Sequence, residues 1–166
     1  VMVLNRIGNP EGAQQVGEQY NAHPLVNIQL SLVDGLEPSE NNQKAGARAV
    51  SLMPNNPVCH AALAVSADKN GDLGRALEAI ETALVFWPNE SGWQYLAAKL
   101  ALSANEMDAA RLHLEKTHAL MPANLDVSLE LGNIYQTLRE FSKAVAVLQK
   151  AVQIAPNNPT VWLAFA

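Results

Sequence analysis

Apolar residues recur at three- and four-residue spacing along most of the chain, in segments separated by short polar turns. Two of these segments run from Leu73 to Trp87 and from Phe141 to Ala155. Each ends at a proline, Pro88 or Pro156, whose ring cannot continue a helix. No stretch shows the alternation of apolar and polar residues that is typical of a half-buried strand. The pattern therefore predicts an all-α chain.

The helical pattern repeats with a period of 34 residues. Four prolines are separated by that distance, namely Pro54, Pro88, Pro122 and Pro156. Because equally spaced prolines could arise by chance, agreement in other columns is the test. One column holds small residues, Ala76, Ala110 and Ala144, and another holds large apolar residues, Ile80, Leu114 and Leu148. We therefore expect stacked helix pairs, in which the small column permits close approach and the large column fills the core.

The unit of residues 125–158 matches a known signature, which reads W-x2-L-G-x2-Y, then A-x3-F, then an Ala and a closing Pro. It carries Leu131, Gly132, Tyr135, Phe141, Ala144, Leu148, Ala151 and Pro156. In these residues the chain closely resembles the tetratricopeptide repeat family, and residues 57–90 follow the same pattern. The resemblance implies a right-handed superhelical solenoid of antiparallel helix pairs, in which first helices line a concave groove.

The resemblance divides the chain into consecutive parts. We expect an N-terminal capping or linking helix in residues 1–22, a degenerate repeat in 23–56, repeats in 57–90, 91–124 and 125–158, and the start of a truncated repeat in 159–166. In the degenerate repeat, Asn42 and Gly46 stand where an Ala and a large apolar residue are expected. Its helices are expected from Pro24 to about Val33 and from Ser39 to Met53.

The repeat of residues 91–124 poses a problem of register. It places Trp93, Leu96, Ala97 and Leu100 one residue early relative to its neighbours. We interpret this as an extra residue in the turn between its two helices, with the unshifted register kept as the alternative.

Composition and charge exclude several classes of partner and site. The 166 residues contain 11 Lys and Arg against 16 Asp and Glu, a net charge of -5, so we expect neither nucleic acid nor an anionic membrane as a partner. Apolar runs are far shorter than the roughly 20 residues that span a bilayer, so no membrane insertion is expected. The lone Cys59 excludes an internal disulfide framework. The chain begins without a targeting signal, as an internal fragment or processed chain would, and a soluble cytoplasmic location is only the default.

No combination of residues in the repeat pattern assembles a catalytic or metal site, so we expect no enzyme activity, no metal and no cofactor. His113 and His118 lie five residues apart and do not form a ligand pair on one helix face. The turn of residues 68–72 begins like a calcium loop but lacks its glycine, so we expect Asp72 to cap a helix. Glu78, Glu81, Glu115 and Lys116 are expected to be ordinary surface charges.

The candidate binding residues are those of the first helices that the core columns leave free. They are Ala61, Val65, Asp68 and Lys69, then Tyr95, Lys99 and Leu102, then Leu129, Asn133 and Gln136. In the shifted register of the third unit, Gln94 and Ala98 replace Tyr95 and Lys99. The carboxylate clamp of some family members needs a Lys and an Asn where this chain has Ala61 and Val65, so that class of partner is not expected.

The resemblance implies a protein–protein interaction module or scaffold that holds a partner peptide or helix in the groove. The alternative is a regulatory or substrate-docking arm of an enzyme whose catalytic domain lies outside these residues. Trp162 and Phe165 stand on signature positions of the last helix, so we also expect weak self-association through them.

Overall fold

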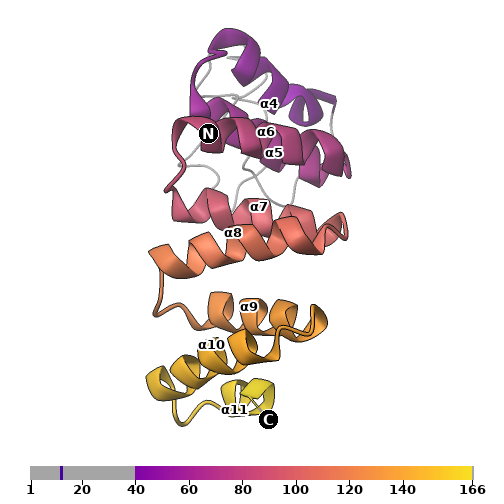
Figure 1. Ribbon diagram of the computed structural model, residues 1–166. Coiled ribbons are helices and arrows are strands. Elements are labelled where there is room, and N and C mark those ends of the chain that lie inside the picture. The colour runs from indigo at the N-terminus through magenta and orange to yellow at the C-terminus, as the bar shows by residue number, and fades with distance from the viewer. Residues whose placement is uncertain (1–11, 13–39, 166) are drawn as a thin grey trace. The chain divides into compact units, whose positions relative to one another are not determined.

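The computed structural model describes residue 12 and residues 40–165 of the chain (Figure 1). These residues contain helices and no strand, which confirms the all-α repeat fold. The helices are α4 (Glu40–Leu52), α5 (Pro57–Lys69), α6 (Leu73–Phe86), α7 (Ser91–Ser103), α8 (Met107–Leu120), α9 (Leu125–Thr137), α10 (Phe141–Ile154) and α11 (Pro159–Phe165). They fall into two compact units, which we call unit 1 (Val1–Pro88) and unit 2 (Asn89–Ala166).

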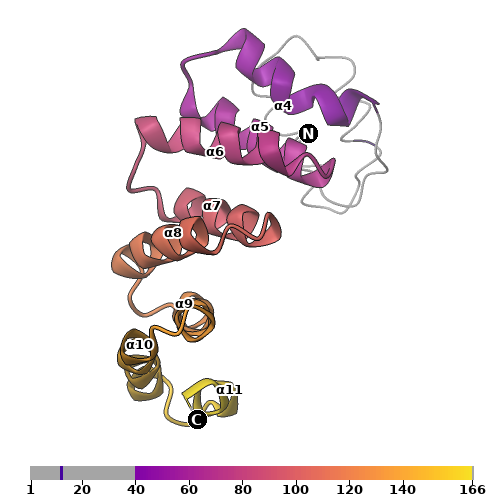
Figure 2. The same cartoon turned by 45° about the vertical axis from the view of Figure 1, so that its right-hand side comes forward.

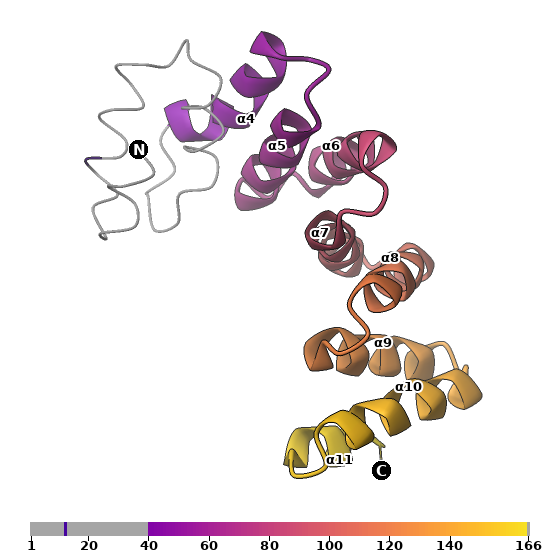
Figure 3. The same cartoon turned by 90° about the vertical axis from the view of Figure 1, so that its left-hand side faces the viewer.

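In unit 1, α5 lies between α4 and α6 (Figure 3). The packing of α4 on α5 explains the unexpected glycine of the degenerate repeat. A Cβ atom at Gly46 would lie 2.6 Å from the Cα atom of Leu63, which is backbone and cannot rotate away. The large apolar residue of the other repeats is therefore absent here because the two helix backbones approach too closely.

In unit 2, the first helices α7, α9 and α11 form one layer and the second helices α8 and α10 form the other (Figure 2). Large apolar side chains from both layers fill the core, and the most buried are Leu100, Leu114, Leu131 and Leu148. Gly132 faces Leu148, and a Cβ atom there would lie 2.6 Å from Leu148 Cδ2. The small and large columns of the sequence thus meet as partners.

The turns between the helices of each pair have the same length in all three repeats, namely residues 70–72, 104–106 and 138–140. The expected extra residue in the third unit is therefore wrong, and α7 keeps the register of its neighbours. Gln94 and Ala98 are buried, whereas Trp93 is only half-buried. Gln94 is tolerated inside because its Oε1 lies 2.8 Å from Nδ1 of His113, which is buried as well.

Local capping contacts define where the helices begin. Asn56 accepts a hydrogen bond from the backbone N–H of Val58, and Asn124 does the same for Val127. Asp72 accepts from the backbone N–H of Arg75 at 3.2 Å, which confirms its expected role as a cap.

The turn within each helix pair needs a residue in the left-handed region. This residue is Gly71 in the first pair, with φ of 77°. In the next two pairs it is Asn105 and Arg139, each with φ of 60°. Gly adopts this conformation freely and Asn tolerates it, but a long side chain such as that of Arg139 is strained there.

Two expectations lie outside the described residues. These are the N-terminal helix of residues 1–22 and the first helix of the degenerate repeat, which was expected from Pro24 to about Val33.

Candidate functional site

The first-helix residues of unit 2 form the candidate site. We call them the first-helix surface and define it as Tyr95, Lys99, Leu102, Leu129, Asn133 and Gln136. Lys99, Asn133 and Gln136 are exposed, while the remaining three are half-buried. The unshifted register thus brings Tyr95 and Lys99 to this surface, and the alternatives Gln94 and Ala98 lie in the core.

The corresponding residues of unit 1 offer less. Ala61 is only 7% exposed, so it presents almost no area to a partner. Val65 is half-buried, and Asp68 and Lys69 are exposed at the end of α5. Small and buried residues therefore take up part of the predicted site in this unit.

Tyr95 and Lys99 both contact one carboxylate, that of Glu130 on α9. Tyr95 Oη donates to Glu130 Oε1 at 2.9 Å, and Lys99 Nζ lies 3.3 Å from the same oxygen. Burial of the phenol, followed by its hydrogen bond to Glu130, raises the pKa of Tyr95 to about 12. The repeat pattern does not identify Glu130, because these contacts join residues that lie 31 and 35 positions apart.

The surface continues from α9 to α11. Gln136 Nε2 donates to the backbone carbonyl oxygen of Ala164 at 3.1 Å. Next to that contact Leu163 is 80% exposed. Gln136 therefore joins two first helices, and its amide is only partly available to a partner.

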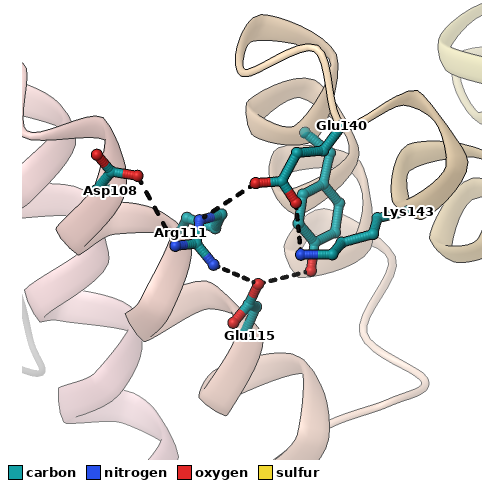
Figure 4. A network of polar contacts seen from close by, with 6 residues as sticks. Asp108, Arg111, Glu115, Glu140 and Lys143 are labelled. Carbon is teal, nitrogen blue, oxygen red and sulfur yellow. Dashed lines mark hydrogen bonds and ion pairs between the residues drawn. The ribbon is translucent and has the colours of Figure 1, made fainter.

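A second polar cluster, which we call the Arg111 network, joins successive repeats (Figure 4). Arg111 lies among three carboxylates, at 2.9 Å from Glu115 Oε1 and at 3.8 Å from both Asp108 and Glu140. These carboxylates raise the pKa of the Arg111 guanidinium, the hydrogen bond to Glu115 most of all. Glu115 is therefore not the ordinary surface charge that its spacing predicts.

Residues of the next repeat complete this network. Tyr135 Oη donates to Glu115 Oε1 at 2.9 Å, and burial with this bond raises the pKa of Tyr135 to about 12. Lys143 pairs with Glu140 and lies 5.4 Å from the centroid of the Tyr135 ring. The hydrogen bond from Lys143 lowers the pKa of Glu140. The network ties α8 to α9 and α10, and its role is structural.

The histidines of unit 2 are occupied by neighbouring side chains. His113 contacts Gln94, and His118 Nδ1 lies 3.3 Å from Ser128 Oγ. Burial, and secondarily the charge of Lys150, lowers the pKa of His118. Within residues 40–165, no three His, Cys, Asp or Glu side chains gather as a metal site would require.

A transmembrane span would need a long apolar helix, and none of the described helices has that length and character.

Comparisons with known proteins agree with the repeat architecture. Two family models, both described as Tetratricopeptide repeat, match residues 61–120 and 101–166. Over 106 residues the chain is 30% identical to Cellulose synthase operon protein C of Pseudomonas fluorescens (strain SBW25). This match covers 64% of the chain but only 8% of that much longer protein.

Solved structures show the same fold at low sequence identity. MamA from Desulfovibrio magneticus RS-1 aligns with a TM-score of 0.77 and 15% identity, over 95% of this chain and 92% of that one. YrrB, described as a TPR protein with an unusual peptide-binding site, aligns with a TM-score of 0.73 and 16% identity, over 98% and 86%. The repeat columns, the helix pairs and both family models agree, and the chain belongs to the tetratricopeptide repeat family.

Proposed function

We propose that this chain is a scaffold that binds a segment of a partner protein on the first-helix surface of unit 2. Proteins built from tetratricopeptide repeats bind protein or peptide partners and are generally non-catalytic. The observation that supports this surface is the pair Leu129 and Asn133, which lie one turn apart on α9 with the amide exposed and the leucine half-buried. The comparisons do not favour the alternative, an arm of an enzyme.

The chemistry of this pair suits an extended or helical peptide. The Asn133 side chain has both donors and an acceptor, so it can bond to a peptide backbone in either sense. Leu129 supplies apolar area next to it, and Tyr95 on α7 supplies an aromatic edge. A partner would gain affinity from the apolar contact and orientation from the amide.

The test replaces Leu129 by Ser and Asn133 by Ala in one variant. Tyr95, Lys99 and Gln136 are left unchanged, because each also holds a contact between helices. We expect partner capture from a native extract to fall at least fivefold. The melting temperature should fall only slightly, because neither side chain lies in the core.

The matched control replaces Leu112 by Ser and Gln149 by Ala on the second helices α8 and α10, where both side chains are exposed. It should capture the partner as the wild type does. Equal losses in both variants, or no loss in either, would contradict the proposal. The name of the relative from Pseudomonas fluorescens makes components of cellulose synthesis the first proteins to look for among those captured.

Weak self-association through α11 is a separate proposal. Trp162 and Leu163 are exposed, and so are Phe141 and Val145 on α10, which together form an apolar area at the edge of unit 2. Sedimentation at several concentrations should show association that is lost when Trp162 and Phe165 are both replaced by Glu. A strictly monomeric chain, or a dimer that ignores both changes, would remove this idea.

A further inference from the structure

The ion pair between Lys99 and Glu130 is unequal in its access to solvent. The Lys99 side chain is 52% exposed, whereas the Glu130 side chain is 27% exposed. An incoming partner therefore reaches the ammonium group of Lys99 more easily than the carboxylate of Glu130.

The two oxygens of Glu130 increase this difference. Oε1 already receives Tyr95 Oη at 2.9 Å and Lys99 Nζ at 3.3 Å. Oε2 is buried from solvent and has no hydrogen-bond partner among the described residues. Neither oxygen is well placed to bind a cation from outside, so this site does not favour a lysine or arginine of a partner.

The donors at this site remain accessible. An ammonium group has three N–H donors, and among the described residues Glu130 is the group that Lys99 Nζ contacts. The exposed amide of Asn133 lies on the same helix as Glu130 and can donate as well. The accessible chemistry of the first-helix surface is thus that of a cation with an amide on the neighbouring helix, which suits a carboxylate.

We propose that the partner segment carries an aspartate or glutamate that binds Lys99, and that Glu130 competes with it by holding Lys99 in the free protein. This inference rests on the proposed function and names the chemistry of the partner. It has a consequence of unusual sign, because removing the charge of Glu130 should strengthen binding instead of weakening it.

The experiment selects random twelve-residue peptides displayed on phage against the full chain. The peptides retained are those that lose binding in the Leu129→Ser, Asn133→Ala variant. We expect an enriched Asp or Glu at one position of these peptides. Replacing it by Asn or Gln in a synthetic peptide should weaken binding at least fivefold, as measured by fluorescence anisotropy.

Substitutions in the ion pair then test the competition. Lys99→Met should weaken binding of the selected peptide at least fivefold, because it keeps the apolar stem and removes the charge. Glu130→Gln should strengthen binding about two- to fivefold, the range expected from freeing one exposed ion pair. Tyr95→Phe is the matched control, because it removes the other hydrogen bond to Oε1 and leaves the pair of charges intact. It should change the affinity less than twofold.

The outcomes separate this inference from the proposed function. Peptides that depend on Leu129 and Asn133 but lack an acidic residue, or that bind equally to Lys99→Met, would overturn the inference and leave the proposed function standing. Weaker binding to Glu130→Gln, with the melting temperature unchanged, would overturn the competition. A selection that yields no peptide dependent on the first-helix surface would count against both.

Discussion

The close approach of α4 to α5 makes a quantitative prediction for Gly46. In a helix, replacing glycine by alanine normally stabilises the protein by up to about 1 kcal/mol, because the unfolded chain loses freedom. At Gly46 the added Cβ atom would lie 2.6 Å from Leu63 Cα and 3.0 Å from the carbonyl oxygen of Ala62. Both neighbours are backbone atoms, so the helix as a whole must move.

The magnitude follows from these two opposing effects. Overpacking of a well-packed interface costs about 1–3 kcal/mol, and we take the upper end because no side chain can rotate away. After subtraction of the helix-forming gain, Gly46→Ala should lower the free energy of unfolding by about 2 kcal/mol. For a chain of this length that corresponds to a fall in melting temperature of about 4–8 °C.

Gly74 in α6 provides the matched control within the same unit. A Cβ atom there would meet nothing within 4 Å, and the residue lies in the first turn of its helix. Gly74→Ala should therefore raise the free energy of unfolding by about 0.5 kcal/mol.

Urea denaturation followed by circular dichroism measures both variants, and hydrogen exchange in α4 and α5 locates the effect. In a repeat protein each unit contacts only its neighbours, so the increase in exchange should be confined to unit 1. If Gly46→Ala is as stable as the wild type, or gains stability as Gly74→Ala does, then α4 does not approach α5 as described.

Other parts of the structure make independent predictions. Arg111→Met should lower the free energy of unfolding by about 1 kcal/mol in urea denaturation, because it leaves several carboxylates without their cation, while Lys116→Met, exposed on the same helix, should change it by less than about 0.5 kcal/mol. Arg139→Gly should raise the melting temperature, with a gain of about 0.5–1 kcal/mol, since glycine relieves the left-handed backbone at φ of 60°. Tyr95 and Tyr135 keep their protons in the folded state up to a pKa of about 12, above the ordinary value of 10, so stability should fall as the pH rises from 10 to 12. Ultraviolet absorbance of tyrosinate would show this, and full ionisation of both residues near pH 10 in the folded protein would contradict it.

The helix positions could be read from the sequence because the repeat supplies the same information several times. First helices begin at Pro57, Ser91, Leu125 and Pro159, each 34 residues after the last. The columns that meet in the core, such as Gly132 with Leu148, lie within one repeat and follow from helix periodicity. Periodicity constrains which helix face is buried, and burial is what the apolar pattern reports.

The polar contacts between repeats could not be predicted in this way. Glu115 and Glu130 occupy positions that periodicity assigns to a solvated face, yet both accept hydrogen bonds from a tyrosine of a neighbouring repeat. Such contacts depend on the length and rotamer of the side chain and on the angle between repeats. A pattern of apolar and polar positions contains neither quantity.

The misplaced register of the third repeat has a more specific cause. Trp93 resembles the tryptophan of the signature, but the position equivalent to the signature tryptophan Trp162 is occupied by Gln94. Trp162 Nε1 donates to the carbonyl oxygen of the closing proline six residues earlier at 2.7 Å, and His60 Nε2 in the same column lies 2.7 Å from the equivalent carbonyl. Gln94 instead contacts His113 across the helix pair. What this column requires is therefore a polar atom with a partner near the start of the helix, which several residue types supply, and matching by residue identity selects the wrong neighbour when the tryptophan lies one position away.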